Sequence, residues 1–263
     1  MFSISSDFLK NLLRFINYKL HVFKAKKIDY SKDSNYPLVS QLRSDGVAKI
    51  ENFSSYEDSA KKLLNTFNLI KNQDIINFIN KNKSQSKSNK ESIKLDFSEF
   101  FSKDDLLNYA NSPKIIRNIS QYFGCKPIPR YVSAWLDYPN DNFNENVLTQ
   151  IFHRDPDDFK LVKTFFYLND VTENNGPFEY IKKSHLKPWI NFFDNREREN
   201  YIRMNFNDND FLIAKFNKDT LLISDTNGFH RGNKLKNGFR ALITVMYTSL
   251  TPRLKSVKDL YIN

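Results

Sequence analysis

Apolar residues recur every three or four positions through the first half of the chain, which predicts amphipathic helices. The clearest segments are SSDFLKNLLRFINYKLHVFKAKK (5–27), SSYEDSAKKLLNTFNLIKNQDIINFIN (54–80) and SPKIIRNISQYFG (112–124). The last of these has Ser112 as an N-cap, Pro113 in its first turn and Gly124 just past its end. Ser54 or Ser55 is the expected N-cap of the middle segment.

After residue 127 the pattern changes to short alternating or continuous apolar runs, rich in β-branched and aromatic residues, which predict strands. The runs are YVSAWLDY (131–138), VLTQIFH (147–153), LVKTFFYLNDV (161–171), PFEYIKK (177–183), TLLISDT (220–226) and FRALITVMYTSL (239–250). The segment KPWINFFDNREREN (187–200) is instead predicted to be a helix inserted between strands. Helices followed by a meander of strands predict an α+β protein whose second half is an antiparallel barrel or a double-sheet jelly roll.

The length and composition fit one domain with an appendage. A chain of 263 residues can bury one large core, so we expect a domain over residues 36–263 and a helical appendage over residues 1–35. Cys125 is the only cysteine, which excludes an intrachain disulfide and a thiolate metal cluster and favours a reducing, cytoplasmic location. Lys10, Arg14 and Lys19 interrupt the first apolar segment, so we expect neither a signal peptide nor a membrane span there.

The formal charge of +10 raises nucleic acid or an anionic membrane as partners. However, the chain is rich in Lys, Asn, Ile, Phe and Tyr and has only 6 Gly, a bias that AT-rich coding produces without selection for a basic surface. We therefore expect no nucleic-acid partner. The basic face of the 5–27 helix is compatible with peripheral membrane contact, but packing of its apolar stripe on the following domain is favoured. The sequence does not indicate an oligomeric state.

The stretch QIFHRDPDDF (150–159) gathers metal-ligand residue types at the end of a predicted strand. On a strand, His153 and Asp155 project from the same face about 6 to 7 Å apart, while Arg154 points the other way. These two side chains are suited to bind one ion, and a third ligand must come from elsewhere in the chain.

The third ligand is expected among the remaining histidines, since the chain has only 4. His21 lies in the predicted N-terminal helix, and His185 follows the run EYIKKS. His230 ends an apolar strand and has a glycine near it on either side, so it is the preferred candidate, with His185 in reserve.

Two histidines and one carboxylate that leave other coordination positions open are typical of non-haem Fe(II) oxygenases. Zinc is the competing metal, but the helical HExxH pattern that usually accompanies hydrolytic zinc is absent from the sequence. The ligand types therefore favour Fe(II).

A cationic side chain is predicted beside these ligands. Asn237–Gly238 is a turn signal between two strand-like runs, and a hairpin of these runs centred near Leu235 would place Arg240 opposite His230. A guanidinium in that position is suited to hold the distal carboxylate of a bidentate acid.

Taken together, these motifs resemble the phytanoyl-CoA dioxygenase family of Fe(II)/2-oxoglutarate-dependent oxygenases. The matching pieces are SDGVAKIENF, FHRDPDDFKLVKTFFYLNDV, NGPFEYIKKSH, GFHRG and FRALITVMY, which lie within residues 36–252. The resemblance implies a double-stranded β-helix, which is a cupin-like jelly roll, with N-terminal and flanking helices. It implies that His153, Asp155 and His230 are the catalytic iron ligands and that Arg240 pairs with the far carboxylate of 2-oxoglutarate.

The resemblance also implies a reaction. Such enzymes use O2 and 2-oxoglutarate to oxidise a small-molecule substrate and release succinate and CO2. Related halogenases have a small residue in place of the acid, so Asp155 favours hydroxylation. Trp135, Gln150, Lys163 and Phe166, which lie in neighbouring predicted strands, are further candidates for co-substrate contacts. The sequence does not choose among them, because a slip of one residue in register would reverse the face that each occupies. For Trp135 and Phe166, packing in the core is favoured over contact with the co-substrate.

The chain departs from the family at Lys183, where relatives often have Gly before Ser-His, so the backbone shape of that corner is in doubt. Two other classes of function stay open. One is a non-catalytic jelly-roll module for ligand binding or scaffolding that has lost turnover. The other is an oxygenase directed at nucleic acid, which would require a basic groove that leads to the iron. Substrate identity cannot be read from the chain, since segments such as 140–146 and 187–209 would determine it.

Overall fold

The computed structural model describes residues 12–13, 15–16, 19–20, 37–85, 94–139, 150–155, 157–187 and 195–249. The helices are α2 (Pro37–Asp45), α3 (Asp58–Leu69), α4 (Asn72–Gln85), α5 (Lys103–Ala110), α6 (Pro113–Phe123) and α7 (Asn195–Asn205). The strands are β1 (Val47–Ile50), β2 (Lys94–Asp96), β3 (Ile128–Asp137), β4 (Leu161–Tyr167), β5 (Phe178–Ile181), β6 (Phe211–Ile213), β7 (Leu221–Asp225), β8 (His230–Gly232) and β9 (Arg240–Thr248).

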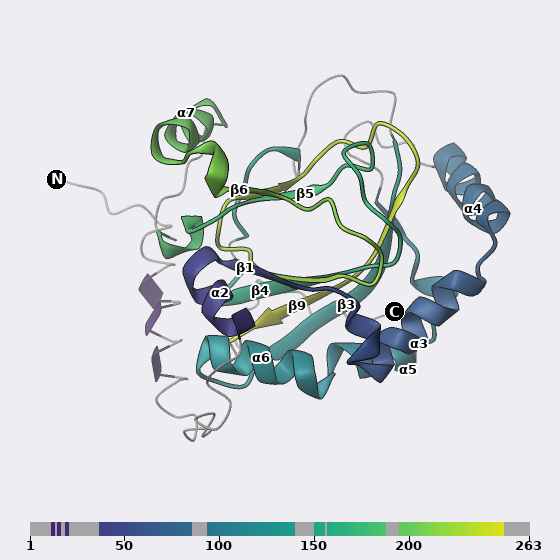
Figure 1. Ribbon diagram of the computed structural model, residues 1–263, viewed down its shortest axis with the longest axis horizontal. Helices are drawn as coiled ribbons and strands as arrows, with labels where there is room; N and C mark the ends of the chain where they lie inside the picture. The colour runs from purple at the N-terminus through teal and green to yellow at the C-terminus, as the bar shows by residue number, and fades with distance from the viewer. Residues whose placement is uncertain are drawn as a thin grey trace.

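The strands form two antiparallel sheets that lie one above the other in Figure 1. The larger sheet has six strands in the order β1-β7-β4-β9-β3-β2, and the smaller has three in the order β6-β5-β8. Helices α2 to α6 precede most of the strands, and α7 lies between β5 and β6, as predicted for the inserted segment. The structure therefore has the predicted mixture of helices and antiparallel sheet.

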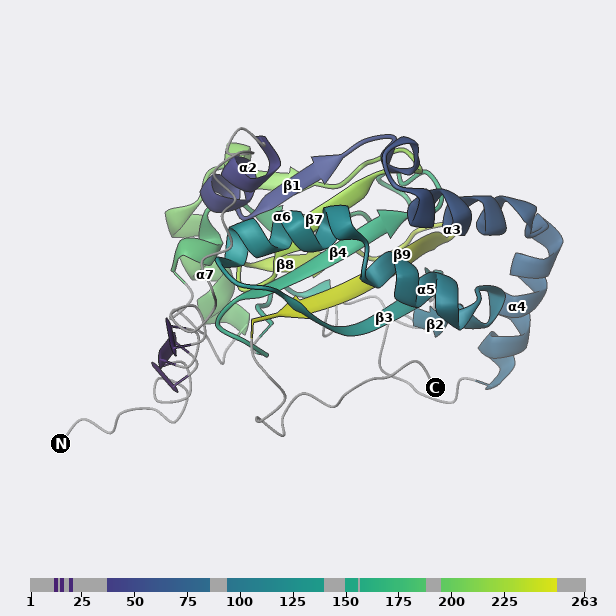
Figure 2. The same ribbon diagram turned by 90° about the horizontal axis from the view of Figure 1, so that it is seen from below.

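The larger sheet is buried on both faces, and successive residues of a strand serve different cores. Helices α3, α5 and α6 cover its outer face (Figure 2), where Phe166 and Ile243 pack into the helix-side core. The neighbouring residues Phe165 and Leu242 point toward the smaller sheet and contact the second core. All nine residues of β9 are buried, which explains why its sequence is a continuous apolar run and not an alternating one.

Helix α6 has the predicted ends, whereas the start of α3 differs from the prediction. Ser112 caps α6 through its hydroxyl, and Gly124 ends it in the left-handed region with φ of 73°. The N-cap of α3 is Glu57, so the prediction of Ser54 or Ser55 is wrong. Ser54 instead donates its backbone N–H and hydroxyl to Asp219, 2.7 and 2.6 Å away, because the chain makes a 3-10 turn before α3 begins.

The predicted hairpin centred near Leu235 is wrong. Strand β8 pairs with β5 in the smaller sheet, and β9 pairs with β3 and β4 in the larger one. The segment between β8 and β9 therefore crosses from one sheet to the other, and Gly238 takes φ of 68° in that crossing. The strand predicted over 147–153 is reduced, within the described residues, to an isolated bridge at His153, while residues 147–149 lie outside the described residues.

Most of the predicted appendage, including His21, lies outside the described residues. Within it, Phe15 is helical and its ring meets that of Phe159 edge to face, with 5.1 Å between centroids. This contact agrees with the prediction that the helix packs on the domain, while the division at residue 35 stays a prediction. Among the described residues, no helix is both long and apolar enough to span a bilayer.

The backbone at Lys183, the position before Ser-His where relatives of the resembled family often have Gly, has the conformation that Gly prefers. Lys183 precedes a 3-10 helix (Ser184–Leu186), has φ of 65°, and donates its N–H to the carbonyl of Asp45 at 3.0 Å. A side chain in this left-handed region costs about 1 to 2 kcal/mol, which the greater freedom of unfolded Gly offsets only in part.

We predict that Lys183→Gly raises the free energy of unfolding by about 0.5 to 1 kcal/mol, measured by urea denaturation. Lys182→Gly is the matched control, since Lys182 is not among the described residues with positive φ, and it should lower that free energy. Equal destabilisation by both variants would contradict the interpretation of this corner.

Candidate metal centre

The side chains of His153, Asp155 and His230 meet in a cavity between the two sheets. One nitrogen of each histidine and one oxygen of the aspartate lie within 4.8 Å of one another, so small side-chain rotations let a single ion contact all three. The backbones of His153 and His230 are bonded to each other in both directions, at 2.9 and 3.0 Å. The N–H of Asp155 donates to the carbonyl of Thr226 at 2.9 Å. Residues far apart in sequence are thus joined through the main chain.

Both imidazoles are oriented by backbone carbonyls. Nδ1 of His153 lies 2.8 Å from the carbonyl oxygen of Ile151, and Nδ1 of His230 lies 3.0 Å from that of Gly228. A carbonyl can only accept, so in the neutral form of each ring Nδ1 carries the proton and Nε2 carries the lone pair. This is the tautomer and orientation found in histidines that bind metal through Nε2.

The electrostatics of the site favour neutral imidazole beside an ionised carboxylate. Burial lowers the pKa of His230 to about 3, and the neighbouring His153 acts in the same direction. For Asp155, burial raises the pKa, but Lys163 and the two histidines together outweigh it and hold the pKa below its usual value. Both protonation states are those that a metal site requires.

Lys163 is the cation closest to the three ligands. Its ammonium lies 2.7 Å from Oδ2 of Asp155, and His230 Nε2 lies 3.7 Å from the same oxygen. Burial lowers the pKa of Lys163, but the charge of Asp155 more than reverses this, so the pKa is raised and the amine stays protonated. Lys163 was one of the residues predicted for co-substrate contact, and it does line the cavity.

Arg240 lines the same cavity as His230, although the two lie in different sheets and do not face each other across a hairpin. Its guanidinium donates twice to Oδ2 of Asp137, at 3.1 and 2.7 Å, and once to the carbonyl of Gly176. Asp137 and Arg240 are direct partners in the β3–β9 pairing. The fork of Arg240 is therefore held in place by a buried carboxylate that the sequence did not single out.

Of the other predicted co-substrate contacts, Trp135 lines the cavity and two residues do not. Gln150 is buried outside the lining of this cavity, and Phe166 packs against Phe53 and Tyr109 in the helix-side core. The prediction that Phe166 faces the cavity is wrong, because Phe165, one residue earlier, lines it instead. Counting in steps of two from Lys163 would have found it.

The remaining candidates are placed away from the cavity. His185, the reserve ligand, lies on the helix side, with Nε2 3.3 Å from the carbonyl oxygen of Arg43. Arg154 points away from its two neighbours, as predicted, and its guanidinium lies 3.8 Å from the centre of the Phe229 ring. Asp158 accepts hydrogen bonds from the backbone and hydroxyl of Ser249.

No family model and no curated protein sequence matches this chain. Solved structures do match it, at low sequence identity. The epimerase SnoN, in complex with Fe3+, alpha ketoglutarate and nogalamycin RO, is 14% identical with a TM-score of 0.53, over 80% of this chain and 82% of that one.

Two further structures have similar overlap. AviO1 from Streptomyces viridochromogenes Tue57 is 14% identical with a TM-score of 0.52, over 80% of this chain and 93% of that one. HygX from Streptomyces hygroscopicus, with nickel and 2-oxoglutarate bound, is 11% identical with a TM-score of 0.50, over 81% and 86%. At these identities the comparisons show a shared fold. The chain thus has the fold of proteins crystallised with a metal and 2-oxoglutarate.

Proposed function

We propose that this protein is an Fe(II)- and 2-oxoglutarate-dependent oxygenase of the phytanoyl-CoA dioxygenase type, built on a double-stranded β-helix, which hydroxylates a small organic molecule. The observation that carries the proposal is the trio His153, Asp155 and His230. One nitrogen of each imidazole and one oxygen of the carboxylate lie within 4.8 Å of one another, and each Nδ1 is held by a backbone carbonyl. Two imidazoles and one carboxylate on one side of an ion are the ligands of this class of iron site.

The residues present fit the metal. In the proposed site His153, Asp155 and His230 hold Fe(II), and the iron supplies the O2-dependent oxidation of 2-oxoglutarate to succinate and CO2 that drives substrate hydroxylation. The described residues around the site include no thiolate, since the lone Cys125 is buried elsewhere, which agrees with iron over a soft-metal site. A halogenase has a small residue at the position of Asp155, which leaves one coordination site of the iron open.

The wall of the cavity supports binding of a keto-diacid. Arg240 keeps donors on both terminal nitrogens beyond those used by Asp137 and Gly176, because a guanidinium has five N–H groups and three are used. We infer that these donors hold the far carboxylate of 2-oxoglutarate. Lys163, Trp135 and Phe165 complete the surroundings, with Lys163 supplying a second positive charge near the ligands.

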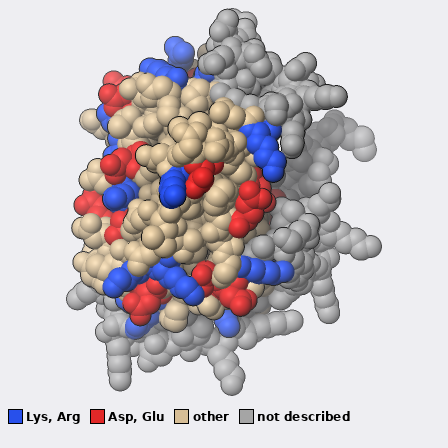
Figure 3. Space-filling model, turned by 90° about the vertical axis from the view of Figure 1, so that its right-hand side faces the viewer, with Lys and Arg blue, Asp and Glu red and all other residues tan. Residues whose placement is uncertain are grey.

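A non-catalytic module is the main alternative. It would keep the fold, but a binding module needs neither a matched pair of Nδ1-anchored imidazoles nor a carboxylate of low pKa between them. Nucleic acid is not favoured as substrate, since acidic and basic side chains are interspersed on the face that Figure 3 presents. The substrate remains a small molecule of unassigned structure, and the cytoplasmic location stays a prediction.

We predict that Ala in place of His153, Asp155 or His230 lowers 2-oxoglutarate-dependent succinate formation more than about 100-fold, beyond the loss typical of outer-shell changes. The assay is succinate release in a metabolite extract, together with anaerobic calorimetry of Mn(II)-dependent 2-oxoglutarate binding. Asp157→Ala is the control, because Asp157 is close in sequence but is not one of the three grouped ligands. It should stay within about twofold of wild type. Unchanged rates in all three ligand variants would refute the site.

We predict that Arg240→Lys weakens 2-oxoglutarate binding about 10-fold or more while Mn(II) binding is unchanged, because a lysine keeps the charge but cannot form the fork. Calorimetry of each ligand separately measures both effects. Arg231→Lys is the matched control, since Arg231 pairs with Glu179 at 2.6 Å and does not line the cavity. Wild-type 2-oxoglutarate affinity in Arg240→Lys, or an equal loss in the control, would remove Arg240 from the co-substrate site.

A further inference from the structure

The candidate metal centre has two arms, which are the segment 153–155 and the residue His230. The turn between β7 and β8, residues 226–229, contacts both arms through its backbone carbonyls. The carbonyl of Thr226 accepts from the N–H of Asp155 at 2.9 Å. The carbonyl of Gly228 lies 3.0 Å from Nδ1 of His230 and fixes that imidazole. Arg154, which lies between His153 and Asp155 in the chain, donates to the carbonyl of Asn227. The position of this turn therefore sets the position of both arms.

A single buried carboxylate, Asp225, holds the turn from within. It is 2% exposed, and its Oδ1 accepts from the backbone N–H of Asn227 at 3.0 Å. Its backbone carbonyl accepts from the N–H of Gly228, also at 3.0 Å. Asn227 and Gly228, which supply these two donors, are among the three residues of the turn whose carbonyls contact the metal arms. The bond from Asn227 thus links the turn to the carboxylate of Asp225, and the bond from Gly228 links it to the Asp225 main chain.

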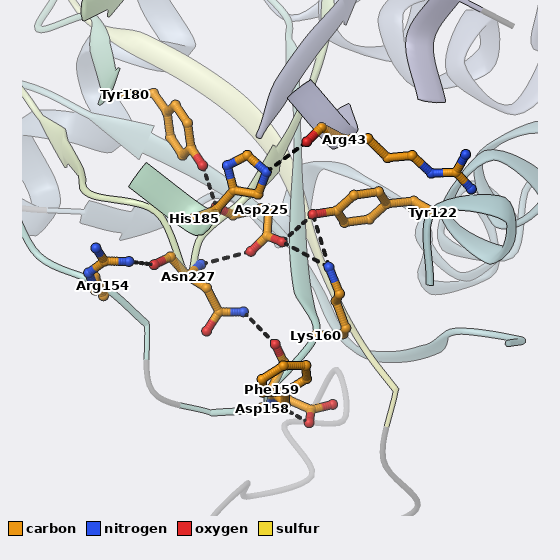
Figure 4. Close-up of polar contacts among 10 residues, drawn as sticks. All are labelled: Arg43, Tyr122, Arg154, Asp158, Phe159, Lys160, Tyr180, His185, Asp225 and Asn227. Atoms are coloured by element: carbon orange, nitrogen blue, oxygen red, sulfur yellow. Dashed lines mark hydrogen bonds and ion pairs between the residues drawn. The ribbon is translucent and has the colours of Figure 1, made fainter. Parts of the chain in front are cut away.

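The other oxygen of Asp225 anchors the turn to the helix layer, as Figure 4 shows. Oδ2 accepts from the hydroxyl of Tyr122, on α6, at 2.5 Å. The ammonium of Lys160 lies 3.9 Å from the same oxygen and donates to the Tyr122 hydroxyl at 3.3 Å. Hydrogen bonds to a charged acceptor are the strong ones, so this contact fixes the carboxylate relative to α6.

The turn has little room to move around this anchor. The hydroxyl of Tyr180 donates to the carbonyl of Asp225 at 2.9 Å, and a Cβ at Gly228 would overlap that hydroxyl. The hydroxyl of Ser184 accepts from the N–H of Phe229 at 2.7 Å. Packing on these sides leaves the hydrogen bonds of Asp225 as the interactions that select the turn's orientation.

We propose that Asp225 is a positioning residue for the metal centre, which acts through the 226–229 turn to hold Asp155 and His230 at the separation that one divalent ion requires. The proposal rests on the proposed metal site. Asp225 contacts neither the ion nor the substrate in this arrangement, and its effect is exerted on the geometry of the ligands. Outer-shell groups that orient ligands in this way typically change metal affinity 10- to 100-fold when they are replaced.

Asn is an informative replacement for Asp225. A carboxylate presents two acceptor oxygens, and both are used, one by Asn227 and one by Tyr122. An amide presents one acceptor and one donor and carries no charge. With its oxygen on the Asn227 N–H, its NH2 group faces the Tyr122 hydroxyl, which can turn to accept, and the Lys160 ammonium, which cannot, so the charge-assisted part of the anchor is lost. Asp225→Asn therefore disturbs the turn with no change of side-chain size.

Asp219 provides a matched control at the opposite end of the same strand. Asp219 precedes β7 and also uses both carboxylate oxygens, which accept from the N–H and the hydroxyl of Ser54. It makes none of the described contacts with the 226–229 turn. Asp219→Asn replaces a carboxylate that also accepts two hydrogen bonds and lies just before β7, and it leaves the contacts with the metal arms unchanged.

The experiment measures the affinity of the full-length protein for Mn(II) by electron paramagnetic resonance, and the midpoint of thermal unfolding without metal. We expect Asp225→Asn to weaken Mn(II) binding about 10- to 100-fold and Asp219→Asn to leave it within about twofold of wild type. Tyr122→Phe keeps the carboxylate but removes one of its donors, and it should weaken Mn(II) binding by a smaller factor. This second variant serves if Asp225→Asn does not fold.

Two results would overturn the assignment of Asp225. One is wild-type Mn(II) affinity in the folded Asp225→Asn protein, or in Tyr122→Phe if Asp225→Asn does not fold. The other is an equal loss of affinity in Asp219→Asn. Absence of Mn(II) binding by the wild-type protein would be a different failure, since it would contradict the metal site itself.

Discussion

The antiparallel bridge between His153 and His230 is the interaction on which the rest of the site depends. Two reciprocal backbone hydrogen bonds join residues that are far apart in the chain. Because main-chain pairing fixes the positions of the Cα atoms, the imidazoles can meet without support from flexible side chains. The carbonyls that bind each Nδ1 then leave both Nε2 atoms available for one ion. Without this bridge the donor atoms would have no shared target.

The cavity around the bridge contains paired charges, as burial requires. Asp155 pairs with Lys163, and Asp137 pairs with Arg240, so the two carboxylates and two cations balance. A divalent metal and a dianionic co-substrate, which the proposed function brings in together, would also balance each other. The same cavity could therefore accept both ligands without a large change in buried net charge.

Local signals in the sequence were sufficient for the elements with their own chemistry. The ends of α6 followed from Ser112 and Gly124, because a cap depends on residues within one turn. The pair of ligands at 153 and 155 followed from residue types and spacing. His230 could be preferred over His185 only from its place at a strand end, and the structure brings it to the other two.

Predictions that required register or long-range pairing were less successful. Phe166 was named as a candidate for co-substrate contact, whereas Phe165 faces the cavity and Phe166 packs in the core. The sequence does not say which face of a strand buried on both sides is which. The turn at Asn237–Gly238 was interpreted as a hairpin, but the local turn signal does not specify which sheet each flanking strand joins. The partner of Arg240 was missed for the same reason, because Asp137 lies on a strand distant in sequence.

The most direct test of the central claim is a crystal structure of the protein with Mn(II) as a redox-stable substitute for Fe(II), measured by anomalous scattering. We expect one anomalous peak about 2.0 to 2.3 Å from Nε2 of His153, Nε2 of His230 and a carboxylate oxygen of Asp155. A peak bound through Nδ1, or one at another set of residues while this trio keeps its place, would contradict it.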